Sequence, residues 1–416
     1  MSNLAPTPGT AYWTGAQGVG GSGSWNTLTG GIANNSNWSL TADGLNVAQQ
    51  VPGATSDVYF SGATATGSPI TASLGANTSI QSLHFTNVGG AVTVGGGGGN
   101  TLTVGTGGIT VDSGAPAPII NSPVALGVAQ TWTNNSANDL TANGAVSGAF
   151  ALTKAGTGTL VLGGSNTFTG GLVINDGAVR VANTDALNST TPQAVTFGPS
   201  APSTAKFQTN GNSITIGALA TDATPGTPIV ENANVTPATL SVSQATNTVY
   251  AGVIQDGTGG GALSFVKRGT GTLSLSGANT YTGTTLVGNG RLLVDGSIGA
   301  GAVSVTANAD NRTALLGGTG TVNGAVTVTT PTGSGRSNVI TAGDVGTTGT
   351  LTLGSGLTIQ SGAIASFDIN DGGTYDSIHV TGNLTLMTGM IVQVPPSLTS
   401  NTSYDLFTYT GTGPAS

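Results

Sequence analysis

Residues 151–182 read ALTKAGTGTLVLGGSNTFTGGLVINDGAVRVA, and residues 264–295 read SFVKRGTGTLSLSGANTYTGTTLVGNGRLLVD. The two stretches align without a gap at an offset of 113 residues, and 14 of their 32 positions are identical. Lys154 pairs with Lys267 in this alignment, and Asn166 pairs with Asn279. An internal repeat of this kind is typical of folds in which one supersecondary unit stacks on the next.

Each copy of the repeat has the rhythm of short strands and tight turns. In the first copy, pairs of alternating apolar residues at 160/162, 172/174 and 179/181 are separated by the turn sequences SNTFTG (165–170) and NDG (175–177). Strands of four to six residues bounded by Gly and Asn predict an all-β protein. A sandwich, a barrel and a solenoid all fit this spacing.

Three observations favour a parallel β-solenoid among these folds. The apolar faces are too narrow to close a core without stacked neighbours. Each strand offers two or three inward Leu, Ile or Val, less bulk than a sandwich interior needs. Asn and Gly recur at matching corners, where Asn tolerates a positive φ and can hydrogen-bond its own or a neighbouring backbone, and Gly adopts a positive φ without steric cost. The predicted structural turn residues are Asn166, Gly170, Asn279 and Gly283.

The composition excludes several classes of protein. Of 416 residues, 70 are Gly and only 6% are charged, so strong helix formers are scarce, which excludes a helical bundle or coiled coil. The net charge is −8 and no basic cluster occurs, so we expect no nucleic-acid partner. Cysteine is absent, which excludes disulfides and thiolate chemistry. No apolar run reaches about 18 residues, and we therefore expect no membrane insertion.

The chain divides into three predicted parts. Residues 1–60 hold Trp13, Trp25 and Trp38, and we interpret this stretch as an aromatic-rich N-terminal cap on the first coil. Residues 61–395 form the predicted elongated solenoid, and residues 396–416 form a C-terminal strand, cap or tail. The start of the chain lacks the basic and apolar regions of a signal peptide, which leaves a cytosolic protein, a trimmed form or another export route. The composition favours an extracellular setting, so we expect a mature, trimmed form.

The repeats resemble a known family. The stretches LTKAGTGTLVLGGSNTFTG (152–170) and FVKRGTGTLSLSGANTYTG (265–283) are similar to the autotransporter-associated β-strand repeat, PATR-like, of bacterial passenger domains. This resemblance implies a right-handed parallel β-helix that is secreted or displayed on the bacterial cell surface. No sequence like the membrane barrel of autotransporters follows the repeats, so we expect a passenger fragment or a relative secreted another way.

One acidic segment is a candidate metal site. Asp368, Asn370, Asp371 and Asp376 lie within nine residues, and oxygen ligands of this type suit Ca²⁺. The alternative is an Asx-rich turn without metal, because the spacing matches no calcium-binding loop. We expect no other cofactor.

Catalytic signatures are weak. His84 and His379 stand singly in alternating strands, and no GxSxG, HExxH or phosphate-loop motif occurs. Lys154 and Lys267 are predicted to point outward, where they either cap backbone carbonyls near a turn or guard against edge pairing.

The sequence therefore predicts a non-enzymatic extracellular structural or adhesive protein. Lateral or end-to-end self-association into a fibre or matrix is one expected property, and a surface glycan or receptor is the other expected partner. Two alternatives stay open: a phage tail fibre, and a β-helix glycan lyase or hydrolase. The second would need carboxylates or arginines meeting across coils, for example Asp176, Asp295, Asp310 and Arg312.

Overall fold

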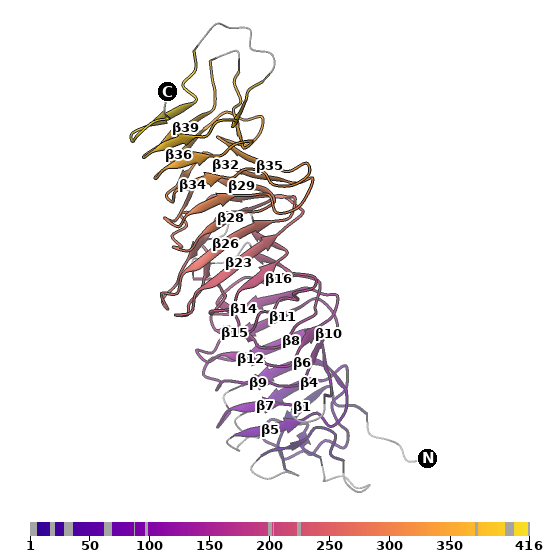
Figure 1. Cartoon of the computed structure of the whole chain (residues 1–416). Helices are drawn as coiled ribbons and strands as arrows, with labels where there is room; N and C mark the ends of the chain where they lie inside the picture. The colour runs from indigo at the N-terminus through magenta and orange to yellow at the C-terminus, as the bar shows by residue number, and fades with distance from the viewer. Residues whose placement is uncertain are drawn as a thin grey trace. The chain divides into compact units, whose positions relative to one another are not determined.

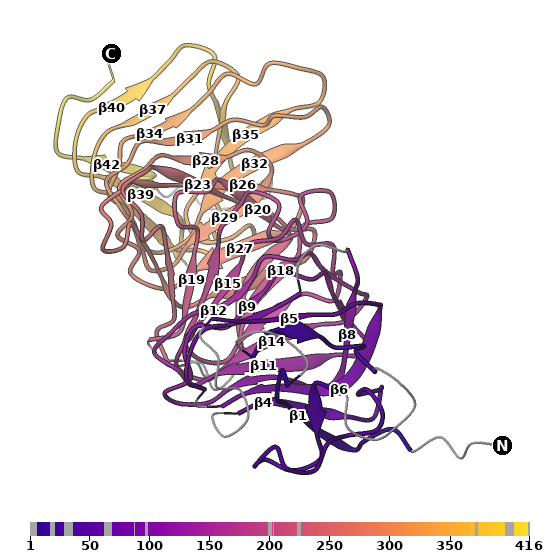
Figure 2. The same ribbon diagram turned by 90° about the horizontal axis from the view of Figure 1, so that it is seen from below.

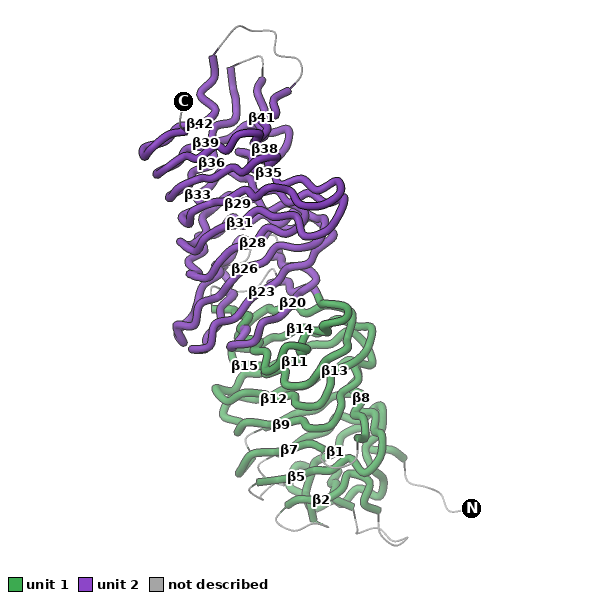
Figure 3. Tube along the Cα trace, in the orientation of Figure 1, with its two compact units in different colours: residues 1–193, 200–208 green, residues 194–199, 209–416 purple. Residues whose placement is uncertain are grey.

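The structure is a computed structural model, and every element in it is a β-strand. It describes residues 6–16, 21–28, 36–61, 69–86, 88–95, 99–198, 202, 204–222, 226–370, 373–395 and 403–414. None of these ranges contains a helix that could span a bilayer. The chain forms two compact units: unit 1 comprises residues 1–193 and 200–208, and unit 2 comprises residues 194–199 and 209–416 (Figure 3).

Unit 1 contains two sheets whose strands stack coil upon coil (Figure 1). The first sheet has the order β3 (Trp38–Ser39), β1 (Thr10–Trp13), β4 (Asp57–Phe60), β6 (Thr78–Phe85), β8 (Leu102–Val111), β11 (Gln130–Asn134), β14 (Leu152–Ala155) and β16 (Leu172–Ile174), with β10 (Val124–Leu126) and β13 (Val146–Ser147) branching from β8. The second has the order β2 (Gly23–Ser24), β5 (Ile70–Ser73), β7 (Val92–Val94), β9 (Ile119–Ile120), β12 (Leu140–Ala142), β15 (Thr159–Leu162), β17 (Ala178–Val181) and β19 (Lys206–Gln208).

Unit 2 contains three long sheets. The first has the order β20 (Ile214–Ile216), β23 (Ala238–Ser243), β26 (Leu263–Arg268), β28 (Thr285–Val287), β31 (Val303–Val305), β34 (Val326–Val328), β37 (Leu357–Ile359) and β40 (Leu384–Leu386). The second has the order β24 (Thr248–Tyr250), β27 (Thr272–Leu275), β29 (Gly290–Val294), β32 (Thr313–Gly317), β35 (Ser337–Thr341), β38 (Ile364–Ser366) and β41 (Ile391–Gln393). The third has the order β30 (Ser297–Ile298), β33 (Thr321–Val322), β36 (Thr350–Leu353), β39 (Ser377–Val380) and β42 (Phe407–Tyr409). Two further pairs are β18 (Ala194–Phe197) with β21 (Ala218–Thr221), and β22 (Ile229–Glu231) with β25 (Val253–Gln255).

Apart from the antiparallel pair of β1 and β3, neighbouring strands within each unit are parallel, and each comes from the next coil of the chain. Thr285 pairs with Val303, 18 residues on, and Val326 pairs with Leu357, 31 residues on. Strands β31, β34, β37 and β40 accordingly follow one another in Figure 2. Because parallel strands cannot be joined by a hairpin, this arrangement requires the chain to travel around the core between partners. The predicted all-β parallel solenoid is confirmed, and the sandwich and barrel interpretations are wrong.

The core lies inside the coils because alternate side chains of each strand point inward. Leu160 and Leu162 of β15 are buried, and their register partners Val179 and Val181 of β17 are buried above them. In the N-terminal part of unit 1, Trp13, Trp25 and Trp38 are fully buried, and Trp38 meets each of the other two edge to face; the predicted capping role stays a prediction. The predicted boundaries at residues 60 and 395 stay predictions.

Candidate functional site

The two repeat lysines lie at the same corner of their coils. Lys154 is on β14 and Lys267 is on β26, and both side chains are completely buried. The Nζ of Lys154 donates to the carbonyl oxygens of Ala155 and Gly156, both at 2.7 Å, and to that of Asp176 in the following coil at 3.2 Å. All three ammonium hydrogens therefore have backbone acceptors.

Lys267 makes the equivalent contacts in the second repeat. Its Nζ donates to the carbonyl oxygens of Arg268 at 2.7 Å, Gly269 at 3.2 Å and, one coil on, Asn289 at 3.4 Å. The predicted capping of carbonyls is thus present, but the predicted outward direction of the lysines is wrong. The aliphatic stem occupies an inward position of the strand, and only the ammonium reaches the corner. Burial lowers the pKa of both ammonium groups to about 8.

The two repeat asparagines each connect three successive coils. The Oδ1 of Asn166 accepts from the N–H of Val146 at 2.7 Å in the preceding coil, and its Nδ2 donates to the carbonyl of Ala186 at 2.7 Å in the following coil. Asn279 bonds Ile254 and Ser297, one coil before and one after, at 2.8 Å each. Neither asparagine has a positive φ. Their side-chain amides therefore satisfy buried backbone groups, so of the two predicted roles the hydrogen bond to neighbouring backbone is present and the left-handed conformation is not.

The two repeat glycines allow the coils to approach closely. A Cβ on Gly170 would lie inside van der Waals contact of the backbone of Phe150 and Ala151 in the preceding coil. A Cβ on Gly283 would meet the backbone of Leu263 in the same way. Neither glycine has a positive φ, so the requirement is for space above the preceding strand.

The comparison with known families bears directly on these corners. Residues 152–181 and 265–294 match the model of the passenger-associated transport repeat. The chain therefore carries two copies of this repeat. The matched ranges contain the lysine, asparagine and glycine of each corner, so the passenger repeats here coincide with the residues that connect one coil to the next.

A curated relative agrees with this assignment. The adhesin BmaC autotransporter of Brucella suis biovar 1 (strain 1330) is 30% identical over 181 residues, which are 43% of this chain. The matched segment spans 4% of that relative's length. The similarity therefore describes a short part of a much longer adhesin.

The acidic segment of unit 2 binds backbone amides. The buried carboxylate of Asp376 accepts from the N–H of Gly349 and of Asp368, both at 2.8 Å, and burial raises its pKa to about 6. Asp368 accepts from Gly346 N–H at 2.6 Å, and Asn370 donates to the hydroxyl of Thr374 at 3.1 Å. Asp371 lies outside the described residues. No cluster of three acidic or imidazole side chains occurs among the described residues, and calcium binding stays a prediction.

A Ser-His-Asp group lies on the outer face of unit 1. The hydroxyl of Ser82 on β6 is 2.5 Å from Asp57 Oδ1 on β4 and 2.8 Å from His84 Nε2. An ionised carboxylate only accepts, so the hydroxyl donates to Asp57 and accepts from the imidazole N–H. A nucleophilic serine needs the opposite direction, with its proton passing to the histidine. The imidazole also stacks on Tyr59 at 4.3 Å, and burial lowers the pKa of His84. The group is therefore a polar link between coils.

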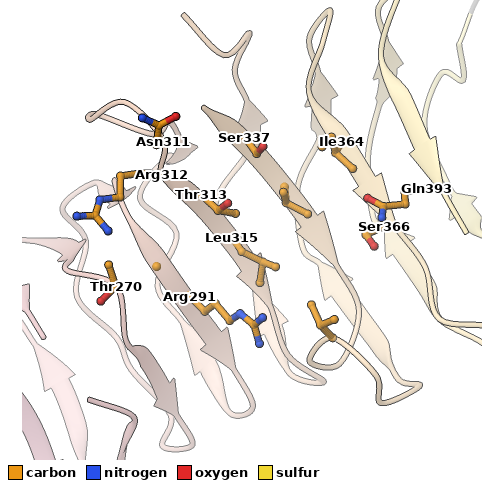
Figure 4. A pocket seen from close by; sticks show the side chains of 13 residues that line it. Thr270, Arg291, Asn311, Arg312, Thr313, Leu315, Ser337, Ile364, Ser366 and Gln393 are labelled. Atoms are coloured by element: carbon orange, nitrogen blue, oxygen red, sulfur yellow. The ribbon is translucent and has the colours of Figure 1, made fainter. Parts of the chain in front are cut away.

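The clearest surface feature of unit 2 is a groove of about 410 Å³ over β29, β32, β35 and β38 (Figure 4). Its floor is an outward-facing apolar row in which Leu315, Val339 and Ile364 are register partners from three successive coils. Arg291 borders the groove and forms an ion pair with Asp344 at 3.0 Å. Arg312 lies at the other side, and among the described residues it has no carboxylate partner.

The described lining of the groove lacks groups for proton transfer. Its described lining comprises arginine, asparagine, glutamine, hydroxyl, glycine and aliphatic residues, with no carboxyl or imidazole group. Glycosidase chemistry requires paired carboxyl groups beside the scissile bond. Of the residues predicted for that alternative, the groove includes Arg312, while Asp310 forms an ion pair with Arg336 at 2.9 Å. The groove was not predicted from the sequence. Its signal there is a set of adjacent apolar residues that break the strand alternation, at 292–293, 315–316 and 339–340.

Proposed function

We propose that this chain is a non-enzymatic, exported adhesive segment in which the stacked coils form a scaffold and the groove of unit 2 contacts a surface ligand. The observation that carries the proposal is the 181-residue similarity to an adhesin passenger. The composition of the groove supports it, because cationic, hydroxyl and aliphatic side chains can hold a ligand without cleaving it.

Affinity at one groove should be modest. The exposed floor is small, since Leu315 and Val339 are already more than nine-tenths buried by their neighbours. Burial of apolar surface contributes only about 25 cal/mol per Å². Attachment would therefore depend on many copies acting together on one surface, as multivalent binding allows.

Beads coated with the full chain test the adhesive role. We expect the beads to attach to at least one of three coated surfaces, hyaluronan, dextran or fibronectin, and Arg312→Gln to reduce attachment at least about threefold. Arg268→Gln is the matched control, because Arg268 is an exposed arginine of unit 2 outside the groove lining. Attachment to none of the three surfaces, or equal loss in both variants, would contradict the proposal.

Two further measurements address the remaining parts of the proposal. Incubation with the same polysaccharides should release no new reducing ends or unsaturated products, and such release would favour the glycan-processing alternative. Antibody labelling of intact producing cells should detect the chain at the cell surface or in the medium. Detection only after lysis would contradict export.

A further inference from the structure

The groove of unit 2 has an apolar floor beside a polar margin. Leu315, Val339 and Ile364 are register partners on β32, β35 and β38 and form the floor. Two residues before the floor positions on β32 and β35, the hydroxyl residues Thr313 and Ser337 are also register partners and line the margin. Such a surface fits a ligand that has an apolar face and a hydroxyl-bearing rim, which is the chemistry of a pyranose ring.

A peptide strand cannot extend the sheet at this groove. Each of the strands β29, β32, β35 and β38 is hydrogen-bonded to a neighbouring strand on both sides. Their backbone N–H and C=O groups are engaged within the sheet, so the edge pairing by which many extended peptides are recognised is not available here. Recognition therefore depends on side chains, and the hydroxyl, amide and guanidinium groups of the lining match the hydroxyls and acidic groups of a glycan.

The positive charge of the groove lies on its β29 and β32 side. Arg291 on β29 is the register partner of Leu315, and Arg312 directly precedes β32 (Figure 4). Arg291 is neutralised by Asp344 at 3.0 Å. Arg312 is exposed, and within the part of the chain that the structure describes it forms no ion pair. One uncompensated guanidinium, beside a described lining without a carboxylate, is complementary to one acidic group of the ligand.

The length of the floor determines how often that acidic group should recur along the ligand. Neighbouring strands of a sheet lie about 4.8 Å apart, so the row from Leu315 through Val339 to Ile364 spans two intervals, or about 10 Å. This length is close to that of two linked pyranose rings. Because the uncompensated charge of Arg312 lies at one end only, the groove fits one acidic sugar followed by one neutral sugar.

We propose that the ligand of the groove is a linear polysaccharide in which sugars that carry a carboxylate alternate with neutral sugars. The carboxylate lies against Arg312, the pyranose faces pack on the aliphatic floor, and Thr313 and Ser337 hydrogen-bond the ring hydroxyls. This inference rests on the proposed adhesive function and specifies the chemical class of its ligand.

Fluorescence anisotropy of a labelled hyaluronan oligosaccharide mixed with the full chain tests the inference, because hyaluronan alternates glucuronate with neutral N-acetylglucosamine. We expect saturable binding that weakens as salt is added. The matched ligand is the same oligosaccharide with its carboxylates reduced to alcohols, which removes the charge and keeps the sugar rings. We expect it to bind at least about threefold more weakly, the scale of an exposed ion pair.

Substitutions at the charged side of the groove provide a second measurement. Arg312→Gln should lower the affinity for hyaluronan at least about threefold, and Arg312→Lys should retain part of it, because lysine keeps the charge but not the planar fork. Asp344→Asn should raise the affinity, because it releases the guanidinium of Arg291 from its carboxylate partner. Arg268→Gln, at an exposed arginine outside the groove lining, is the control and should change nothing.

Several results would overturn the inference: equal affinity for native and carboxyl-reduced hyaluronan, equal affinity for a polyglutamate peptide of the same charge, or an affinity that Arg312→Gln leaves unchanged. Its failure is distinguishable from failure of the adhesive role. If coated beads attach to dextran or fibronectin through Arg312 and the chain does not bind hyaluronan, the inference is wrong and the proposed function stands. Attachment to none of the three surfaces contradicts the proposed function itself.

Discussion

The ammonium group of Lys154 lies 3.2 Å from the backbone carbonyl oxygen of Asp176, which belongs to the following coil. The same ammonium also bonds two carbonyls of its own corner. A buried cation is therefore placed where two coils meet, with neutral acceptors around it. Gly177 leaves room for this contact, because a Cβ there would lie 2.8 Å from the lysine Nζ.

Removal of a corner lysine should lower stability. In Lys154→Met, three part-buried carbonyl oxygens lose their donor, while the cost of burying a charge disappears; we expect the first effect to dominate by about 2 kcal/mol. The guanidinium chloride midpoint of Lys154→Met and Lys267→Met should fall, whereas the exposed-site control Arg268→Met should not change it. An unchanged midpoint in the lysine variants would show that the carbonyls find other donors.

The lysines should also produce a distinctive pH dependence. Burial lowers their pKa from 10.5 to about 8, so between pH 8 and 10.5 the unfolded chain binds more protons than the folded chain. The free energy of unfolding should therefore rise with pH in this window, by about 2 kcal/mol per lysine between pH 7 and pH 10. Urea unfolding at several pH values measures the rise.

A control variant and the titration of two buried tyrosines both bear on how the pH dependence of stability is interpreted. The Lys154→Met/Lys267→Met double variant should lack the rise, and a rise that persists in it would assign the effect to other groups. Burial raises the pKa of Tyr250 and Tyr281 above 10.0, so the unfolded chain releases their protons first. Stability should consequently fall again above pH 10.

Loss of a repeat asparagine should destabilise the fold, because its side chain connects three successive coils by hydrogen bonds. Asn166→Ala leaves the N–H of Val146 and the carbonyl of Ala186 buried without partners, and we expect a loss of about 2–4 kcal/mol. Thr167→Ala, at an exposed neighbouring position, is the control and should cost less than about 0.5 kcal/mol. Hydrogen exchange of the Val146 amide reports the lost bond directly. Equal exchange in variant and parent would refute the bridging role.

The corner glycines should resist any added side chain. Gly170→Ala and Gly283→Ala place a Cβ against the backbone of the preceding coil, so each should destabilise by about 1–3 kcal/mol through overpacking. Gly9→Ala, where a Cβ would meet nothing within 4 Å, should have no measurable effect. Thermal unfolding midpoints distinguish these variants. Tolerance of alanine at residue 170 would mean that the coils can separate locally.

The fold could be predicted from the repeat because the residue preferences that determine it act within a single coil. Alternating Leu and Val, together with Gly at the corners, defines inward positions and bends within a single coil. The direction of Lys154 depends in part on one carbonyl, that of Asp176, 22 residues further on, which the strand pattern does not reveal. The amide bonds of Asn166 likewise depend on partners 20 residues away on both sides. Of the two roles predicted for Asn166, the hydrogen bond to neighbouring backbone is present and the positive φ is not.

The groove was missed for a related reason. Alternation predicts one buried face per strand, but β32 buries both Leu315 and Leu316, one on each face of the sheet. The outer leucine gains its cover from register partners and from Arg291, which bonds Asp344 some 53 residues away. The sequence separation between two contacting residues depends on the number of residues in the coils between them, and this number varies along the chain.

The asparagine bridges have a consequence for how such chains can change length during evolution. A single passenger repeat contains the amide but neither of the backbone groups that it satisfies, which lie on the coils on either side. Copying or deleting one repeat by itself would leave a buried polar group without its hydrogen-bond partner at each new junction between coils. Viable insertions and deletions must then preserve the whole three-coil neighbourhood, so lengthening by recombination should favour blocks larger than the repeat that sequence comparison recognises.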